Sequence, residues 1–136
     1  MARFAGYAAV FNRADHSGDV IRRGAFGQVG PVPLLWGHDA GRPAGVLERV
    51  EEDARGLRVI GAAAGVARGM GLSFGYRVRA ARYGTYRELK SLELVEVSLV
   101  AVPMQPLARV HAVQAHDGSG AGVETPSAGQ PRVSED

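Results

Sequence analysis

Residues 91–102 read SLELVEVSLVAV, and this stretch decides the fold class. Leu and Val fill most of it, Glu96 and Ser98 fall on one face, and Pro103 follows its end. This pattern is typical of a buried β-strand. The 19 Gly and 7 Pro separate the apolar runs too often for a helical bundle. We therefore predict a mainly β protein: a small closed or partly open barrel of six to eight short strands with little helix. Its other strands are expected within 3–12, 20–21, 32–36, 45–61, 72–79 and 86–89.

The length and composition indicate one domain. A chain of 136 residues that is 46% hydrophobic is neither globally disordered nor long enough for two ordinary domains. We expect the β-domain to cover 1–114 and a disordered tail to cover 115–136, where Gly, Ser, Pro, Thr and acidic residues leave little to bury. There is no apolar run of the roughly 18 residues that a membrane span needs, and no secretory signal. We therefore expect a soluble intracellular protein without a membrane partner.

The residue types exclude several kinds of chemistry. Cysteine is absent, which rules out disulfides, thiolate metal sites and a cysteine nucleophile. The four histidines, at positions 16, 38, 111 and 116, show no metal-ligand spacing, and no P-loop pattern is present. We therefore predict no metal and no cofactor. The net charge is only +2, and 15 of the 16 basic residues are scattered arginines. No specific nucleic-acid partner is expected from that distribution.

The remaining option is a serine nucleophile activated by a histidine base. His38 follows the apolar run LLWG. Ser73 lies between Gly71 and Gly75, and such small neighbours let a peptide backbone approach a hydroxyl. Glu96 interrupts an apolar strand, where a carboxylate costs several kcal/mol unless it is paired. Glu96 is therefore a candidate partner for His38.

Simpler interpretations of the same residues stay open at this point. His38 is also explained as a residue that ends a strand, and Ser73 as a serine on a solvent-facing strand surface. Glu96 is equally well explained by an ion pair with Arg77 or Arg79.

Four segments in this order resemble motifs of the prohead (capsid maturation) serine proteases of tailed phages. They are GYAAVFNRADHSGDVIRRGAF at 6–26, LLWGHD at 34–39, GLSFGY at 71–76 and EVSLVAVPMQPLA at 96–108. The resemblance covers about residues 4–110, and four ordered motifs are far more specific than any one of them.

The resemblance implies a serine endopeptidase with a barrel similar to that of the herpesvirus assemblins. It implies Ser73 as nucleophile and His38 as base, and Glu96 is our choice for the third member. Backbone N–H groups around 77–79 are expected to be the oxyanion donors. The implied substrate is the major capsid protein or a scaffold segment, cleaved inside an assembling procapsid in the bacterial cytoplasm. Assemblin-like enzymes dimerise, so a homodimer is also implied.

The segment before the serine motif departs from the family pattern. Only residues 62–70 stand there, where family members usually have a longer, helical segment. This shortening suits a reduced phage-like element such as a gene transfer agent. It also keeps an alternative open: a catalytically inactive module of the same fold that binds capsid or scaffold segments, for example by adding a strand at a sheet edge.

Overall fold

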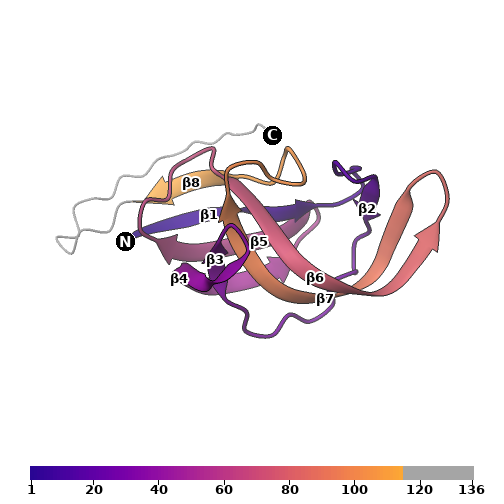
Figure 1. Ribbon diagram of the computed structural model, residues 1–136, viewed down its shortest axis with the longest axis horizontal. Helices are drawn as coiled ribbons and strands as arrows, with labels where there is room; N and C mark the ends of the chain where they lie inside the picture. Colours follow the sequence, from indigo (N-terminus) through magenta and orange to yellow (C-terminus); the bar gives the residue numbers. More distant parts are fainter. Residues whose placement is uncertain (115–136) are drawn as a thin grey trace.

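Strand β7 (Arg87–Val100) organises the sheet of this protein. The structure is a computed structural model and describes residues 1–114. Its eight strands form one curved, mixed sheet (Figure 1), with β6 paired to β7 outside the main order β2-β7-β3-β4-β5-β1-β8. The other strands are β1 (Ala2–Val10), β2 (Asp19–Ile21), β3 (Leu34–Trp36), β4 (Asp39–Glu52), β5 (Gly56–Ala63), β6 (Gly71–Tyr83) and β8 (Val110–Gln114).

The register of β7 brings distant segments together. One half of β7 pairs in parallel with β3, and there Ser98 lies opposite Leu35. Along its other edge β7 pairs antiparallel with β6, and Ser98 lies opposite Ser73. Ser98 is therefore flanked on one side by the strand that leads into His38 and on the other side by the strand that carries Ser73.

The two faces of β7 have different surroundings. Val97 and Leu99 are fully buried in the hydrophobic core, together with Leu34 and Leu72 on the neighbouring strands. Because side chains alternate along a strand, Glu96 and Ser98 point to the opposite face. Burial of the apolar face fixes the register, since a slip by one residue would exchange the two sets.

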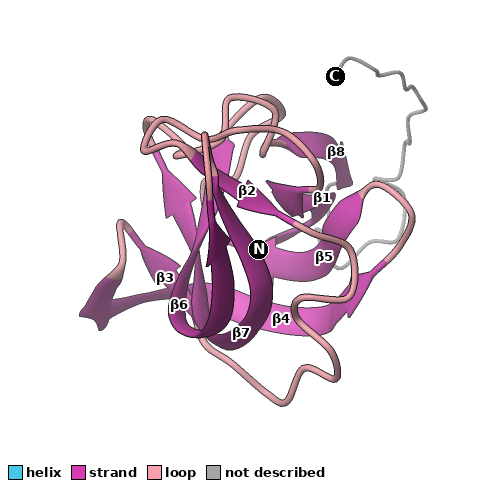
Figure 2. Ribbon diagram, turned by 90° about the vertical axis from the view of Figure 1, so that its right-hand side faces the viewer, coloured by secondary structure: helices cyan, strands magenta, loops and turns pink. Residues whose placement is uncertain are grey.

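The prediction of a mainly β protein with six to eight strands is confirmed, and residues 1–114 form no helix. A closed barrel is not confirmed. The sheet curls strongly (Figure 2), but β6 and β8 form no ladder with each other. A single bridge between Gly71 and Arg109 and hydrogen bonds such as Leu72 N–H to Ala108 O, at 2.9 Å, link them at one end only.

Strand β4 begins earlier than expected. The strand predicted within 45–61 starts at Asp39, directly after a two-residue hairpin turn. The disordered tail predicted for 115–136 lies outside the described residues. Within the described part of the chain, no helix is long and apolar enough to cross a membrane.

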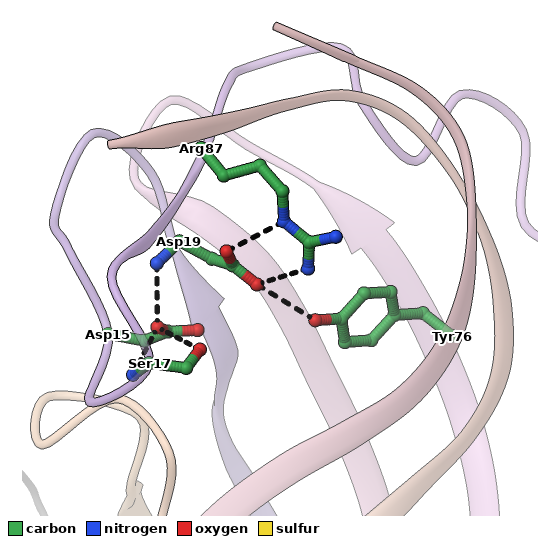
Figure 3. A network of polar contacts seen from close by, with 5 residues as sticks. All are labelled: Asp15, Ser17, Asp19, Tyr76 and Arg87. Carbon is green, nitrogen blue, oxygen red and sulfur yellow. Dashed lines mark hydrogen bonds and ion pairs between the residues drawn. The ribbon is translucent and has the colours of Figure 1, made fainter. Parts of the chain in front are cut away.

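A partly buried ion pair connects β2 to the β6–β7 hairpin (Figure 3). Both Asp19 oxygens accept hydrogen bonds from Arg87, Oδ1 from Nε at 2.8 Å and Oδ2 from Nη2 at 2.6 Å. The Tyr76 hydroxyl donates to Asp19 Oδ2 at 3.3 Å. The Arg87 guanidinium holds the pKa of Asp19 below its usual value, against the opposing effect of burial. The ion pair therefore stabilises the folded state only while Asp19 is ionised.

Acidification should remove the stabilisation that the Asp19–Arg87 ion pair gives to the folded state. Because the folded-state pKa of Asp19 is lowered, its stabilisation is fully present above the unfolded value of about 3.9 and is lost as pH falls through the folded value. We expect Asp19→Asn to lower the free energy of unfolding at pH 7, and the gap to wild type to narrow below about pH 4. Urea denaturation at pH 7, 4 and 3 measures this.

Glu48→Gln is the matched control, because Glu48 pairs with Arg3 on the exposed surface. Its effect should stay within about 0.5 kcal/mol at every pH. A gap between wild type and Asp19→Asn that stays constant from pH 7 to 3 would contradict the assigned role of the Asp19–Arg87 pair.

Candidate active site

His38 lies in a strained hairpin turn. Trp36 pairs with Asp39, so Gly37 and His38 form a two-residue loop, and both have positive φ, 57° and 63°. This is the geometry of a type I′ turn, which favours Gly or Asn at such positions. An L-residue with a Cβ pays about 1–2 kcal/mol there. Because strained backbone conformations of this kind cluster at functional sites, a histidine held in one indicates a functional role.

Hydrogen bonds to β7 hold the turn in place. Gly37 N–H donates to Leu99 O at 2.9 Å, and His38 N–H donates to Ser98 Oγ at 2.9 Å. His38 Nδ1 lies 2.5 Å from Glu96 Oε2, and Ser98 Oγ donates to Glu96 Oε1 at 2.7 Å. Each hydrogen bond contributes about 0.5–1.5 kcal/mol, and more where a charged group takes part, so together they offset the strain.

The arrangement fixes which imidazole nitrogen carries a proton. A carboxylate oxygen only accepts hydrogen bonds, so His38 Nδ1 must be the donor to Glu96. In the neutral ring this leaves the lone pair on Nε2. Glu96 is 7% exposed and Ser98 is fully buried, whereas the His38 side chain is 43% exposed. A buried acceptor therefore orients an imidazole whose free nitrogen remains within reach of a ligand.

Ser73 is placed by strand pairing. It lies opposite Ser98 in the β6–β7 ladder, and Gly75 lies opposite Glu96. Directly opposed residues of an antiparallel pair point to the same face. Ser73 therefore stands on the face of the sheet that carries the Glu96–Ser98 pair.

Ser73 and His38 line one pocket of about 80 Å³. Its other polar walls are Asp15, Tyr76 and Gln105, and its apolar walls are Ala8, Phe74 and Met104. Ser73 is 7% exposed, and among residues 1–114 its hydroxyl makes no side-chain hydrogen bond. Burial raises the pKa of the Tyr76 hydroxyl, and the Asp19 charge adds to this, so that hydroxyl stays protonated at neutral pH. The pocket thus joins a hydroxyl to an oriented imidazole.

The structure decides between the alternatives for Glu96. It contacts His38 and Ser98, whereas the guanidinium groups of Arg77 and Arg79 lie 3.5 and 3.7 Å from Glu93. Residues 77–79 are exposed and do not line the pocket. At about 3.3 Å per residue, Arg77 lies about 13 Å along β6 from Ser73, so the expected oxyanion donors there are misplaced.

No metal centre emerges from the other histidines. The described residues contain no group of three or more His, Asp or Glu side chains that could hold a metal ion. The ring of His111 lies 5.8 Å from that of Tyr7 on the β1–β8 side of the sheet. His116 lies outside the described residues.

The sequence assigned no role to Ser98, and it assigned Gly75 only the role of a small neighbour of Ser73. Ser98 was placed on the face of Glu96, but only the fold shows that its hydroxyl contacts both His38 and Glu96. A Cβ at Gly75 would collide with Glu96 Oε2 and lie 3.0 Å from Glu96 Cδ. The absence of a side chain at Gly75 thus leaves room for the Glu96 carboxylate. In the sequence, the indication of this close approach was a glycine within a strand, two residues after Ser73.

Substitution of Gly75 tests this clearance. We expect Gly75→Ala to displace the Glu96 carboxylate, to break its hydrogen bond with His38 and to destabilise the fold by about 1–3 kcal/mol. The proton NMR signal of His38 Nδ1–H, slowed in exchange by the Glu96 partner, should disappear. Gly30→Ala is the control, since a Cβ there meets nothing within 4 Å and Gly30 has no positive φ. An unchanged His38 signal in Gly75→Ala would contradict the assignment.

Comparison with known proteins gives a consistent result. The family model of the caudovirus prohead serine protease matches residues 1–119. The prohead protease of Enterobacteria phage HK97 is 32% identical over 138 aligned positions, which cover 85% of this chain. The chain spans only 61% of the length of that relative. A match over most of the chain to both the family model and this relative shows that the protein belongs to the caudovirus prohead serine protease family.

Proposed function

We propose that this protein is a serine endopeptidase that trims a capsid or scaffold protein inside an assembling procapsid. In this proposal Ser73 is the nucleophile, His38 the general base and Glu96 the group that orients the imidazole. The observation that carries it is the pocket shared by Ser73 and His38, with Nδ1 of that histidine bound to buried Glu96. Membership of a serine protease family supports the same assignment.

The proposed reaction follows the usual order for acyl transfer. Ser73 Oγ attacks the scissile carbonyl carbon while His38 Nε2 takes the hydroxyl proton. His38 returns this proton to the leaving amine as the C–N bond breaks, which leaves an acyl group on Ser73. A water molecule then attacks the ester, gives its proton to His38 Nε2, and the Ser73 hydroxyl reforms as the acid product leaves. Glu96 keeps Nδ1–H bonded throughout and stabilises the imidazolium.

A second candidate is a non-catalytic module that binds capsid or scaffold segments. One observation favours it: within residues 1–114, Ser73 Oγ and His38 Nε2 form no hydrogen bond with each other. Such bonds are often long before substrate binds, so substrate cleavage separates the two candidates. A binding module would retain a capsid segment without cleaving it, and Ser73→Ala would leave that binding unchanged.

Co-expression with the cognate capsid protein tests the proposal. We expect wild type to shorten the capsid protein or its scaffold region, as measured by intact mass and N-terminal sequencing. Ser73→Ala should abolish the shortening. His38→Asn should lower it at least about a thousandfold while the protein stays folded, because Asn tolerates the left-handed conformation of this turn.

Ala64→Ser is a matched surface control, since Ala64 is exposed in the loop after β5, and it should process normally. Trimming that persists in both Ser73→Ala and His38→Asn would refute the proposed chemistry.

A further inference from the structure

The free polar atoms of the active-site pocket point to a feature beyond the reacting pair. Most polar groups that line the pocket already form hydrogen bonds with other residues of the protein. Gln105 Oε1 accepts from Val10 N–H at 2.8 Å, and its Nε2 donates to the Val10 and Arg13 carbonyls. The Tyr76 hydroxyl donates to Asp19. Besides Ser73 Oγ and His38 Nε2, the side-chain atom without a hydrogen bond from any described residue is Asp15 Oδ2.

Asp15 is held rigidly by its other oxygen. Asp15 Oδ1 accepts from Ser17 N–H at 2.8 Å, Ser17 Oγ at 2.7 Å and Asp19 N–H at 2.9 Å. In Figure 3 no dashed line joins the second oxygen to any of the other residues drawn. The pocket wall next to Asp15 is also held in place, because His16 N–H donates a hydrogen bond to Met104 O at 3.1 Å. The carboxylate is therefore preorganised and does not have to move to meet a ligand.

The charge of Asp15 is uncompensated by a cation within the described residues. The neighbouring Asp19 is neutralised by its two hydrogen bonds with Arg87, and Asp15 has no ion pair with residues 1–114. Phe74, Met104 and Ala8 supply the apolar walls. Apolar walls around one fixed carboxylate suit a ligand with an aliphatic stem and a cationic end, as in Lys and Arg side chains.

The pocket has room for the end of such a side chain and not for all of it. Its volume of about 80 Å³ is close to half of the ~150 Å³ cavity that takes a benzene molecule. Because Ser73 and His38 form part of the same wall, a side chain bound there belongs to a residue next to the scissile bond.

We infer that Asp15 is a specificity-determining residue, and that the pocket selects a substrate peptide with Lys or Arg beside the scissile bond. This inference rests on the proposed endopeptidase function for its substrate, but its ligand preference can be measured without cleavage. Asp15→Asn is the informative variant, because Asn keeps an Oδ1 acceptor for the turn and removes the charge.

The first experiment measures binding alone. The full chain is titrated with n-butylguanidinium and with its neutral analogue n-butylurea, and the backbone amide NMR signals of Phe74 and Tyr76 are followed. We expect the guanidinium to bind about tenfold more tightly than the urea, or better, in wild type. In Asp15→Asn the two should bind alike. Equal binding of both compounds to wild type, or a preference that survives in Asp15→Asn, overturns the inference.

The second experiment maps cleavage sites. A pool of peptides from a bacterial proteome digested at glutamate is incubated with the full chain, and the new termini are identified by mass spectrometry. Wild type should cut beside Lys or Arg, and Asp15→Asn should lower kcat/KM at these sites by about ten- to a hundredfold. Cuts without enrichment of basic residues overturn the inference.

Asp53→Asn is the matched control, since Asp53 Oδ1 caps a turn in the same way, accepting from Arg55 and Gly56 N–H, and Asp53 does not line the pocket. It should cut like wild type. If wild type cuts no peptide, the proposed endopeptidase function fails on its own, and the binding experiment still decides whether Asp15 selects a basic group.

Discussion

The fastening of the Gly37–His38 turn to strand β7 is the constraint on which the candidate site depends. His38 adopts φ 63°, a conformation that disfavours any residue with a Cβ. It is held there because Ser98 Oγ accepts its backbone N–H and Glu96 accepts from its ring. The free-energy cost of the backbone strain and the free energy gained from these hydrogen bonds are of similar size. His38 therefore stays in this conformation only while the register of β7 places Glu96 and Ser98 beside the turn.

That register is set by the opposite face of β7. Val97 and Leu99 are fully buried in the core, and a slip by one residue would move them to the face of the candidate site and place Glu96 and Ser98 among the apolar side chains of the core. The same ladder places Ser73 beside Ser98, so the hydrophobic core indirectly holds the hydroxyl and the imidazole in one pocket. Packing of one face of β7 in the core therefore fixes the positions of the site residues on its other face.

Much of this was accessible from sequence, for identifiable reasons. The apolar run around Glu96 predicted its strand, and the cost of an unpaired buried carboxylate predicted a partner for it. The β3–β4 tip was harder, because no strand was expected between residues 36 and 45, whereas β4 begins at Asp39 directly after the turn at Gly37 and His38. The roles of Ser98 and Gly75 depend on cross-strand register, which no local pattern encodes. The wall formed by Asp15 depends on a loop more than fifty residues away from Ser73 along the chain.

The protonation of His38 tests the central claim most directly. Nitrogen-15 NMR of the histidine-labelled protein at neutral pH distinguishes the two neutral tautomers by their ring nitrogen shifts. The structure predicts that the neutral His38 ring carries its proton on Nδ1, bonded to Glu96, and that Glu96→Gln shifts this balance. A His38 ring protonated on Nε2 in wild type, and unaffected by Glu96→Gln, would contradict the claim that β7 orients this imidazole for catalysis.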